Sequence, residues 1–200
     1  MPYEAEHRQR TRARIVQSAR ALFNQRGFDE VSIRDIMTRA GLTHGGFYRH
    51  FESKGQLYAE VVSLSYDFAS AEARGLIRAY LSRRHLKNVD GGCPLITLPS
   101  DVARADPEVK RAFESVFRSM VDCFERELKG GGPRSRPLAI AAICVGAMAV
   151  ARAVEDRALG DALRVAAREC ALHLGGWNGA RRRTVTSRRT RSTRSTSSRR

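Results

Sequence analysis

The feature that most constrains this chain is a succession of apolar stripes at helical spacing, separated by glycines. In the first stripe Ile15, Ala19 and Phe23 recur at that spacing, while arginines and glutamines fill the opposite face. Gly27 and Gly41 follow the first two stripes and suit helix ends. Because strand-like alternation is not found anywhere in the sequence, the pattern predicts an all-α fold.

The first 60 residues predict short helices with very short connections. Ser32, Thr43 and Ser53 precede three of them, where their hydroxyls can cap free backbone amides. A glycine turn between the second and third helices is typical of a helix-turn-helix. The expected helices cover residues 8–26, 33–40 and 44–50, and a fourth runs from about residue 54 through Leu57, Val61, Leu64 and Phe68.

The middle of the chain repeats the helical pattern on a larger scale. Asp106-Pro107 combines a capping residue with a proline suited to a first turn, and Gly130–Pro133 should end the long helix that it opens. The expected segments lie around Leu76–Leu81, just after Pro94, and at residues 107–128, 138–154 and 159–174.

Several protein classes are disfavoured by composition. The apolar run Leu138–Ala151 has 14 residues, which is short for a bilayer span and indicates a buried helix. Met1–Glu4 lack a basic region followed by an apolar stretch, so no secretory signal is expected. The four cysteines form no metal-binding or redox pair, which predicts reduced thiols in a cytoplasm and no metal site.

The net charge of +15 is unevenly distributed. Residues 178–200 contain nine arginines and no acid, residues 1–55 carry +4, and residues 56–177 carry +2. Basic ends attract polyanions such as nucleic acid. The Arg/Ser/Thr-rich tail at 178–200 is expected to be disordered, either as a basic arm or as the product of an altered reading frame.

The N-terminal quarter resembles the signature of the TetR family of bacterial regulators over roughly residues 10–60. That resemblance implies a helix-turn-helix DNA-binding domain at 1–55 and a helical effector-binding and dimerisation domain at 56–177. The residues that carry it are Ile15, Ala19, Phe23, Gly27-Phe28, Val31-Ser32-Ile33, Ile36, Ala40-Gly41-Leu42-Thr43, Phe47-Tyr48, His50-Phe51, Ser53-Lys54 and Leu57.

The family pattern, transferred position by position, also implies which residues contact DNA. Alternatives remain: Tyr48 as a half-buried core aromatic, His50 as an ordinary surface or capping residue, and the arginines near the N-terminus as a solvated helix face. The implied phosphate contacts are Thr43, Tyr48, His50, Lys54 and Ser32, the base-facing residues are His44, Gly45, Gly46, Arg34 and Arg49, and the backbone arm is Arg8, Arg10 and Arg12.

Gly45-Gly46 is unusual within a helix, because each glycine costs about 1 kcal/mol relative to alanine. The pair permits close approach of the backbone to a duplex and removes two side chains from base readout. Sequence specificity would then depend mainly on His44, Arg34 and Arg49.

For the C-terminal region the resemblance implies a homodimer formed by the last two helices, which would read a palindromic double-stranded DNA operator. The small and apolar residues of Leu138–Ala151 favour close helix packing, although a central core helix of a monomer is the alternative. A mostly hydrophobic small-molecule effector is expected. Its candidate pocket residues are Phe68, Tyr80, Phe113, Phe117 and Phe124.

Cys93 is the cysteine singled out as a possible sensor. It lies in Gly91–Leu95, which resembles a segment found in a subgroup of these regulators, just before a helical segment. Amides at a helix start lower the pKa of a thiol, so a reactive thiolate is predicted. The alternative is a small residue that fills a loop.

Together these features predict a ligand-responsive repressor with no cofactor, no metal and no membrane association. An activator on the same fold and a non-specific basic nucleic-acid-binding protein are the alternatives. An enzyme is not expected, because the sequence lacks a nucleophile elbow, a P-loop, a dinucleotide fingerprint and metal-ligand spacing.

Overall fold

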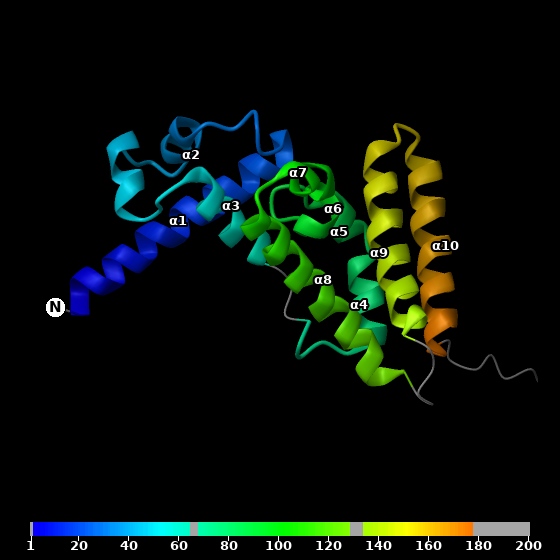
Figure 1. Ribbon diagram of the computed structural model, residues 1–200. Helices are drawn as coiled ribbons and strands as arrows, with labels where there is room; N and C mark the ends of the chain where they lie inside the picture. The colour runs from blue at the N-terminus through cyan, green and yellow to red at the C-terminus, as the bar shows by residue number, and fades with distance from the viewer. Residues whose placement is uncertain (1, 65–67, 129–133, 178–200) are drawn as a thin grey trace, which may run out of the picture.

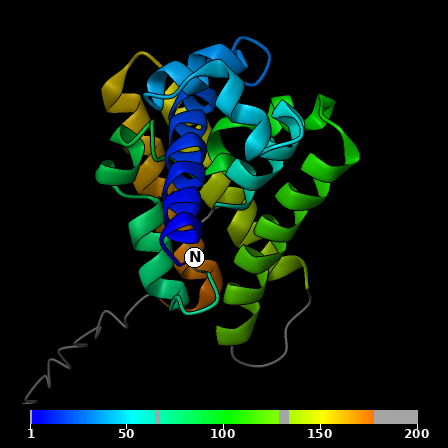
Figure 2. The same ribbon diagram turned by 90° about the vertical axis from the view of Figure 1, so that its left-hand side faces the viewer.

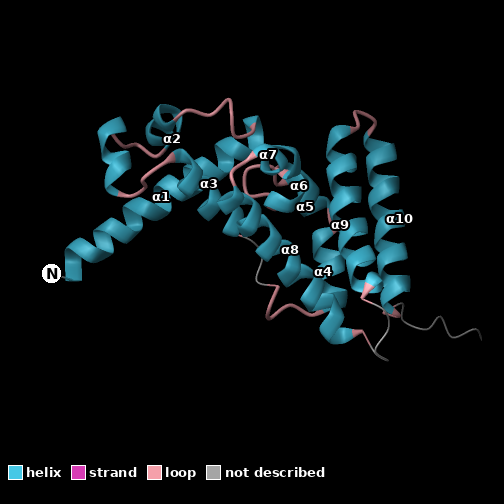
Figure 3. Ribbon diagram, viewed as in Figure 1, coloured by secondary structure: helices cyan, strands magenta, loops and turns pink. Residues whose placement is uncertain are grey.

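A computed structural model describes residues 2–64, 68–128 and 134–177, and every regular element in these ranges is a helix (Figures 1 and 3). The all-α prediction is therefore confirmed. The predicted tail at 178–200 and the helix end at Gly130–Pro133 lie outside the described residues. The elements are α1 (Pro2–Arg26), α2 (Ile33–Arg39), the 3₁₀-helix η1 (His44–Arg49), α3 (Lys54–Ser63), α4 (Ala73–Tyr80), α5 (Arg83–Lys87), α6 (Pro94–Thr97), α7 (Pro99–Arg104), α8 (Pro107–Glu127), α9 (Ser135–Ala153) and α10 (Arg157–Gly175).

α1 is longer than predicted, because it begins at Pro2 rather than near residue 8. Its first turns are exposed where the structure describes their side chains, and they carry no apolar stripe. The hydrophobic periodicity therefore did not predict that these turns are helical. In Figure 1 these turns extend beyond the other helices. The predicted stripe is confirmed: Ile15, Ala19 and Phe23 are almost completely buried. Gly27 ends the helix with a positive φ of 80°.

The signals that start and end α2 are confirmed. The Ser32 hydroxyl accepts from the Asp35 amide at 3.1 Å, and the Asp35 carboxylate accepts from the Ser32 amide at 3.0 Å. These reciprocal bonds form a capping box. Gly41 then turns the chain with φ of 66°.

The helix after this turn is 3₁₀ rather than α. Gly45 and Gly46 have the weakest helix propensity of any residue except proline, and 3₁₀ geometry is common in such short segments. Phe47 and Phe51 are buried, as predicted from their spacing. Thr43 occupies the N-cap position, but its side chain makes no capping hydrogen bond.

α3 begins as predicted and ends earlier. The Ser53 hydroxyl accepts from the Gln56 amide at 3.0 Å, whereas the Gln56 side chain accepts from Glu52 rather than closing a capping box on Ser53. The helix ends at Ser63 and does not reach Phe68. Phe68 belongs to the C-terminal core.

The described helices bury two separate hydrophobic cores. The N-terminal core combines α1, α2, η1 and α3 with Leu98, Val102 and Val109, which come from the region of α7 and the start of α8. α7 itself was not predicted. The C-terminal core lies among α4, α6, α8, α9 and α10. Because the N-terminal core includes Leu57 and Val62, its packing crosses the division at residues 55/56, which stays a prediction.

α8, α9 and α10 confirm the predicted long helices, with ends that differ from the prediction by at most three residues. α9 and α10 stand side by side as an antiparallel pair in Figures 1 and 2. Asp156 caps α10 by accepting from the amide of Ala158 at 2.8 Å. Asp106 precedes Pro107 as expected, but its side chain makes no capping hydrogen bond.

Among the described residues, α9 is the one helix long and apolar enough to cross a membrane by length and composition alone. It has 19 residues and extends beyond both ends of the apolar run Leu138–Ala151. Core helices meet the same criteria, and Ile140, Cys144 and Met148 of α9 are fully buried. α9 also packs against α10 and α8 as a core helix does.

Candidate nucleic-acid interface

η1 presents an exposed polar face opposite its buried Phe47. The Tyr48 side chain is 62% exposed, and its ring meets the rings of His44 and Phe47 edge-on, with centroids 6.4 and 5.2 Å away. This exposure excludes the alternative in which Tyr48 is a half-buried core residue. His44 and Arg49 are exposed on the same short helix, and Arg34 is exposed on α2.

Gly45 and Gly46 are not required by the backbone, because both lie outside the positive-φ region. A Cβ added at Gly45 would meet no atom within 4 Å, and one at Gly46 would lie at ordinary contact distance from Met37. The fold therefore tolerates side chains at both positions. Their absence leaves the backbone of η1 open to close approach from outside.

A cleft of about 890 Å³ lies between α1 and the turn that leads into η1. None of the described residues that line it is acidic. Three lining residues, His7, Thr11 and Arg14, were not predicted, although their i, i+4, i+7 spacing places them on one face of α1. The full lining is His7, Arg8, Thr11, Arg14, Met37, Leu42, Thr43, Gly46, Arg49 and His50; below, it is called the basic cleft.

His50 lines this cleft in a partly buried position. Partial burial lowers the pKa of its imidazole, and the nearby charges of Arg12, Arg8 and Arg49 lower it further. A neutral imidazole retains one N–H donor, which is sufficient for a hydrogen bond to a phosphate.

Arg8, Arg10 and Arg12, the arginines predicted to contact the DNA backbone, lie in three different environments. Arg8 faces the basic cleft, whereas Arg10 pairs with Glu6 at 2.5 Å on the exposed side of α1. Arg12 is turned inward: its guanidinium donates to the His50 carbonyl and to Glu60, and lies 4.0 Å from the ring centroid of Phe51. Arg12 therefore joins α1 to η1 and α3, and its role toward DNA stays a prediction.

Two other predicted phosphate contacts already have partners within the protein. The Ser32 hydroxyl donates to Asp35 at 2.6 Å, and this bond is the largest cause that lowers the pKa of the Asp35 carboxyl. The Lys54 ammonium lies 4.1 Å from the ring centroid of Phe28, and burial lowers its pKa. Their roles toward DNA stay predictions.

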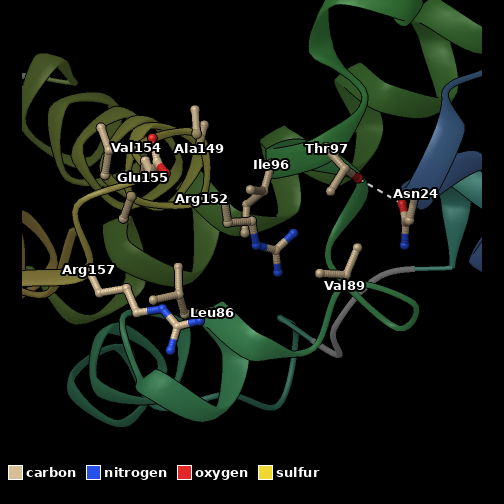
Figure 4. A pocket seen from close by; sticks show the side chains of 12 residues that line it. Asn24, Leu86, Val89, Ile96, Thr97, Ala149, Arg152, Val154, Glu155 and Arg157 are labelled. Atoms are coloured by element: carbon tan, nitrogen blue, oxygen red, sulfur yellow. Dashed lines mark hydrogen bonds between the residues drawn. The ribbon is translucent and has the colours of Figure 1, made fainter.

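The predicted effector residues pack in or against the C-terminal core, and of the five only Phe117 lines a described hollow, a small one of about 220 Å³ between α8 and the start of α9. Phe68, Tyr80 and Phe124 are almost completely buried, while Phe113 and Phe117 pack against the core from its edge. A cavity of about 510 Å³ lies elsewhere, among α1, the end of α5, α6 and the end of α9 (Figure 4). None of the five predicted residues lines it.

Cys93 does not have the environment that a reactive thiolate needs. It precedes α6, but its side chain is completely buried, and desolvation raises the pKa of the thiol. The expected lowering of the pKa is therefore wrong, because burial outweighs the nearby amides and arginines. Cys93, Cys123, Cys144 and Cys170 are free thiols, as predicted.

Comparisons with known proteins agree with this geometry. Residues 15–61 match the family model for bacterial regulatory proteins of the tetR family. AcrR of Shigella flexneri, an HTH-type transcriptional regulator, is 40% identical over 57 residues, which is 28% of this chain and 26% of AcrR. The chain thus matches only about a quarter of that relative's length.

Solved structures extend the likeness in fold to most of the chain. Reduced NemR of E. coli aligns with a TM-score of 0.67 at 17% identity, covering 82% of this chain and 95% of NemR. A SmeT–triclosan complex aligns with a TM-score of 0.55 at 19% identity, covering 82% and 90%. Residues 15–61 are thus similar in sequence to the helix-turn-helix of the tetR family, and the chain as a whole is similar to these solved structures in fold.

Proposed function

We propose that this protein is a transcriptional repressor that binds a palindromic operator as a homodimer and releases it when a small effector binds. In this proposal it acts in the cytoplasm and catalyses no reaction. The observation that carries the proposal is the exposed polar face of η1 beside a basic cleft with no acid in its described lining.

This arrangement suits duplex DNA. A helix can enter the major groove with its exposed face toward the base edges while flanking cations contact phosphates. His44 and Arg49 are the side chains best placed to read bases from η1. The cleft places Arg8 beside them, where it would follow the DNA backbone, whereas Arg14 in the same lining donates to the Ala40 carbonyl at 2.6 Å and ties α1 to the end of α2.

Dimer formation is supported by the outer face of α9 and α10. Leu138 and Val150 of α9 are 41% and 50% exposed, and Leu159 of α10 is 55% exposed. Small residues on the same two helices, including the exposed Gly146, permit close helix approach. Pairing of two copies through this face would bury the apolar residues and duplicate η1 for a two-half-site operator.

Effector control is supported by the continuity of α1. Its N-terminal half lines the basic cleft, and Asn24 near its other end lines the 510 Å³ cavity. A ligand in that cavity would therefore touch the helix that faces DNA. SmeT, which has a similar fold, forms a complex with the small molecule triclosan.

Selection of bound sites from random DNA by the full chain tests the proposal. We expect a palindromic consensus bound by a dimer. Thr43→Val and Tyr48→Phe each remove one hydroxyl, from a side chain that makes no capping bond and from an exposed ring, and should weaken binding evenly across sequences. His44→Gln should instead relax the preference at one base position.

The same experiment distinguishes the alternatives. Recovery of no consensus, together with steep salt dependence, would support non-specific binding instead. A reporter gene placed behind the selected site should be silenced by the protein, whereas increased expression would identify an activator.

A further inference from the structure

The 510 Å³ cavity combines apolar walls with cationic side chains. Its volume lies in the range of about 300–1,000 Å³ that is usual for small-molecule sites. Leu86, Val89 and Ile96 are among its apolar lining residues and lie around the Arg152 guanidinium in Figure 4. The guanidinium groups of Arg152 and Arg157 extend toward the same space from the end of α9 and the start of α10.

The charges around the cavity favour an anion. Glu155 is the one acid in the described lining, against Arg152 and Arg157. An adjoining groove shares Arg157 and adds Arg83, Lys87 and Asp161. The Asp161 carboxylate accepts from Arg83 at 2.5 Å and from Arg164 at 3.0 Å, so its charge is compensated. Positive charge therefore dominates both hollows.

Arg152 also holds the loop of residues 88–92, which borders the cavity. Its Nη2 donates to the carbonyl of His85 at 2.8 Å and to that of Asn88 at 3.2 Å. A Cβ at Gly92 would lie 3.0 Å from Arg152 Nη1, so the loop packs closely against the guanidinium. A carboxylate accepts a stronger hydrogen bond from a guanidinium than a backbone carbonyl does.

The other side of the 88–92 loop is bound to the DNA-facing half of the protein. Asn24 donates to the carbonyl of Asp90 at 3.1 Å and to that of Gly92 at 3.3 Å, and it accepts from Thr97 at 2.7 Å. Arg20 donates to the carbonyls of Gly91 and Gly92.

The Asp90 side chain adds two further ties. It accepts from Gln25 at the end of α1 at 2.6 Å and from Arg39 at the end of α2 at 3.4 Å. One loop therefore joins Arg152 to the two helices that position η1.

We propose that the cavity binds the effector and that this effector is a small organic carboxylate with an apolar body. Arg152 is its charge partner, and the 88–92 loop relays binding to α1 and α2. The anion competes with the carbonyls of His85 and Asn88 for the guanidinium, which loosens the loop and the helices attached to it. This inference rests on the proposed repressor function and specifies its ligand and its relay.

Calorimetric titration of the full chain with 2-naphthoate and 2-naphthamide tests the ligand class, because the two probes share an apolar body and differ in charge. Wild type should bind the carboxylate about tenfold or more tightly than the amide, as a charge-assisted contact predicts. Arg152→Gln should abolish this preference. Arg78→Gln, an exposed arginine of α4 outside the cavity lining, should retain it.

Two further variants keep the test decisive if Arg152→Gln does not fold. Arg157→Gln changes an exposed side chain and leaves the bonds of the 88–92 loop in place, so it should reduce the preference for the anion. Val89→Trp fills the mouth of the cavity from an exposed position and should weaken both probes. Equal binding of both probes by wild type, or an unchanged preference in the folded arginine variants, would overturn the proposal.

A separate readout distinguishes this inference from the proposed function. Naphthoate, but not naphthamide, should release wild type from its selected DNA site, and Val89→Trp should remain bound. Naphthoate binding without any selected DNA site would contradict the repressor function and leave the ligand site standing. A selected site that naphthoate never releases would contradict the relay.

Discussion

Two groups of arginines lie near opposite ends of α1 and differ in what their guanidinium groups contact. Arg8 and Arg49 face the basic cleft, whose described lining contains no acid. Arg20 and Arg152 donate to backbone carbonyls around the 88–92 loop. Cations that face solvent beside other cations attract phosphate, whereas cations bound to carbonyls hold segments together. Arg12 lies near the first group in sequence but belongs to the second by its contacts.

The largest expected effect is on stability, when an arginine of the second kind is removed. Arg12→Met deletes bonds to the His50 carbonyl and to Glu60 and the contact with Phe51. Because the pair is partly exposed, we expect a loss of about 2 kcal/mol in the free energy of unfolding. Urea denaturation measures it. Arg8→Met is the matched control on the same helix and should change stability by no more than about 0.5 kcal/mol.

The second prediction concerns DNA binding, for which Arg8 rather than Arg12 should have the larger effect. Arg8→Met should weaken binding to the selected site and reduce the slope of log K against log salt by about 0.9 for each phosphate that the protein no longer neutralises. Titrations at several salt concentrations check this slope. If Arg8→Met binds DNA with the wild-type slope, the basic cleft is not a phosphate-binding surface.

A smaller effect is expected at Gly45 of η1, where one substitution should change stability and DNA binding in opposite directions. Gly45→Ala should leave the fold intact or stabilise it by up to about 1 kcal/mol, because its Cβ meets open space. The same methyl group should weaken operator binding if the backbone of η1 approaches the duplex closely. Thermal unfolding and DNA titration measure the two effects. A variant that is more stable and binds DNA normally would contradict close approach at this position.

The smallest expected effect concerns pH. Burial lowers the pKa of His85 below 6.5, and the charges of Arg152 and Arg20 oppose its protonation. The unfolded chain therefore takes up a proton at higher pH than the folded protein, and stability falls as pH drops below about 6.5. Denaturation at pH 7 and pH 5.5 should show this decrease, and His85→Gln should make it shallower. An unchanged slope would place the responsible group elsewhere, such as His50, whose pKa is also lowered.

The two regions also differ in how far sequence could predict them. The signals in residues 27–54 lie close together in sequence, so Gly27, the capping box at Ser32 and the buried Phe47 could be predicted from spacing alone. The inward role of Arg12 could not, because Glu60 lies 48 residues away.

The cavity was missed for the same reason. Asn24, the stretch from Leu86 to Ile96, and Arg152 come from three segments that are distant in sequence, and no pattern in the sequence brings them together. Aromatic residues such as Phe124 were predicted to line a pocket, yet they fill the core, since large apolar side chains are most stable where packing is complete. The burial of Cys93 likewise depends on contacts that its local sequence does not show.

The central claim is that η1 and the first half of α1 form one DNA-binding surface. Amide hydrogen exchange of the full chain, with and without its selected DNA site, tests it most directly. We predict added protection in residues 42–50 and in residues 5–14, with little change on α9 and α10. Protection that appears on α9 and α10, while residues 42–50 exchange as in the free protein, would contradict the account.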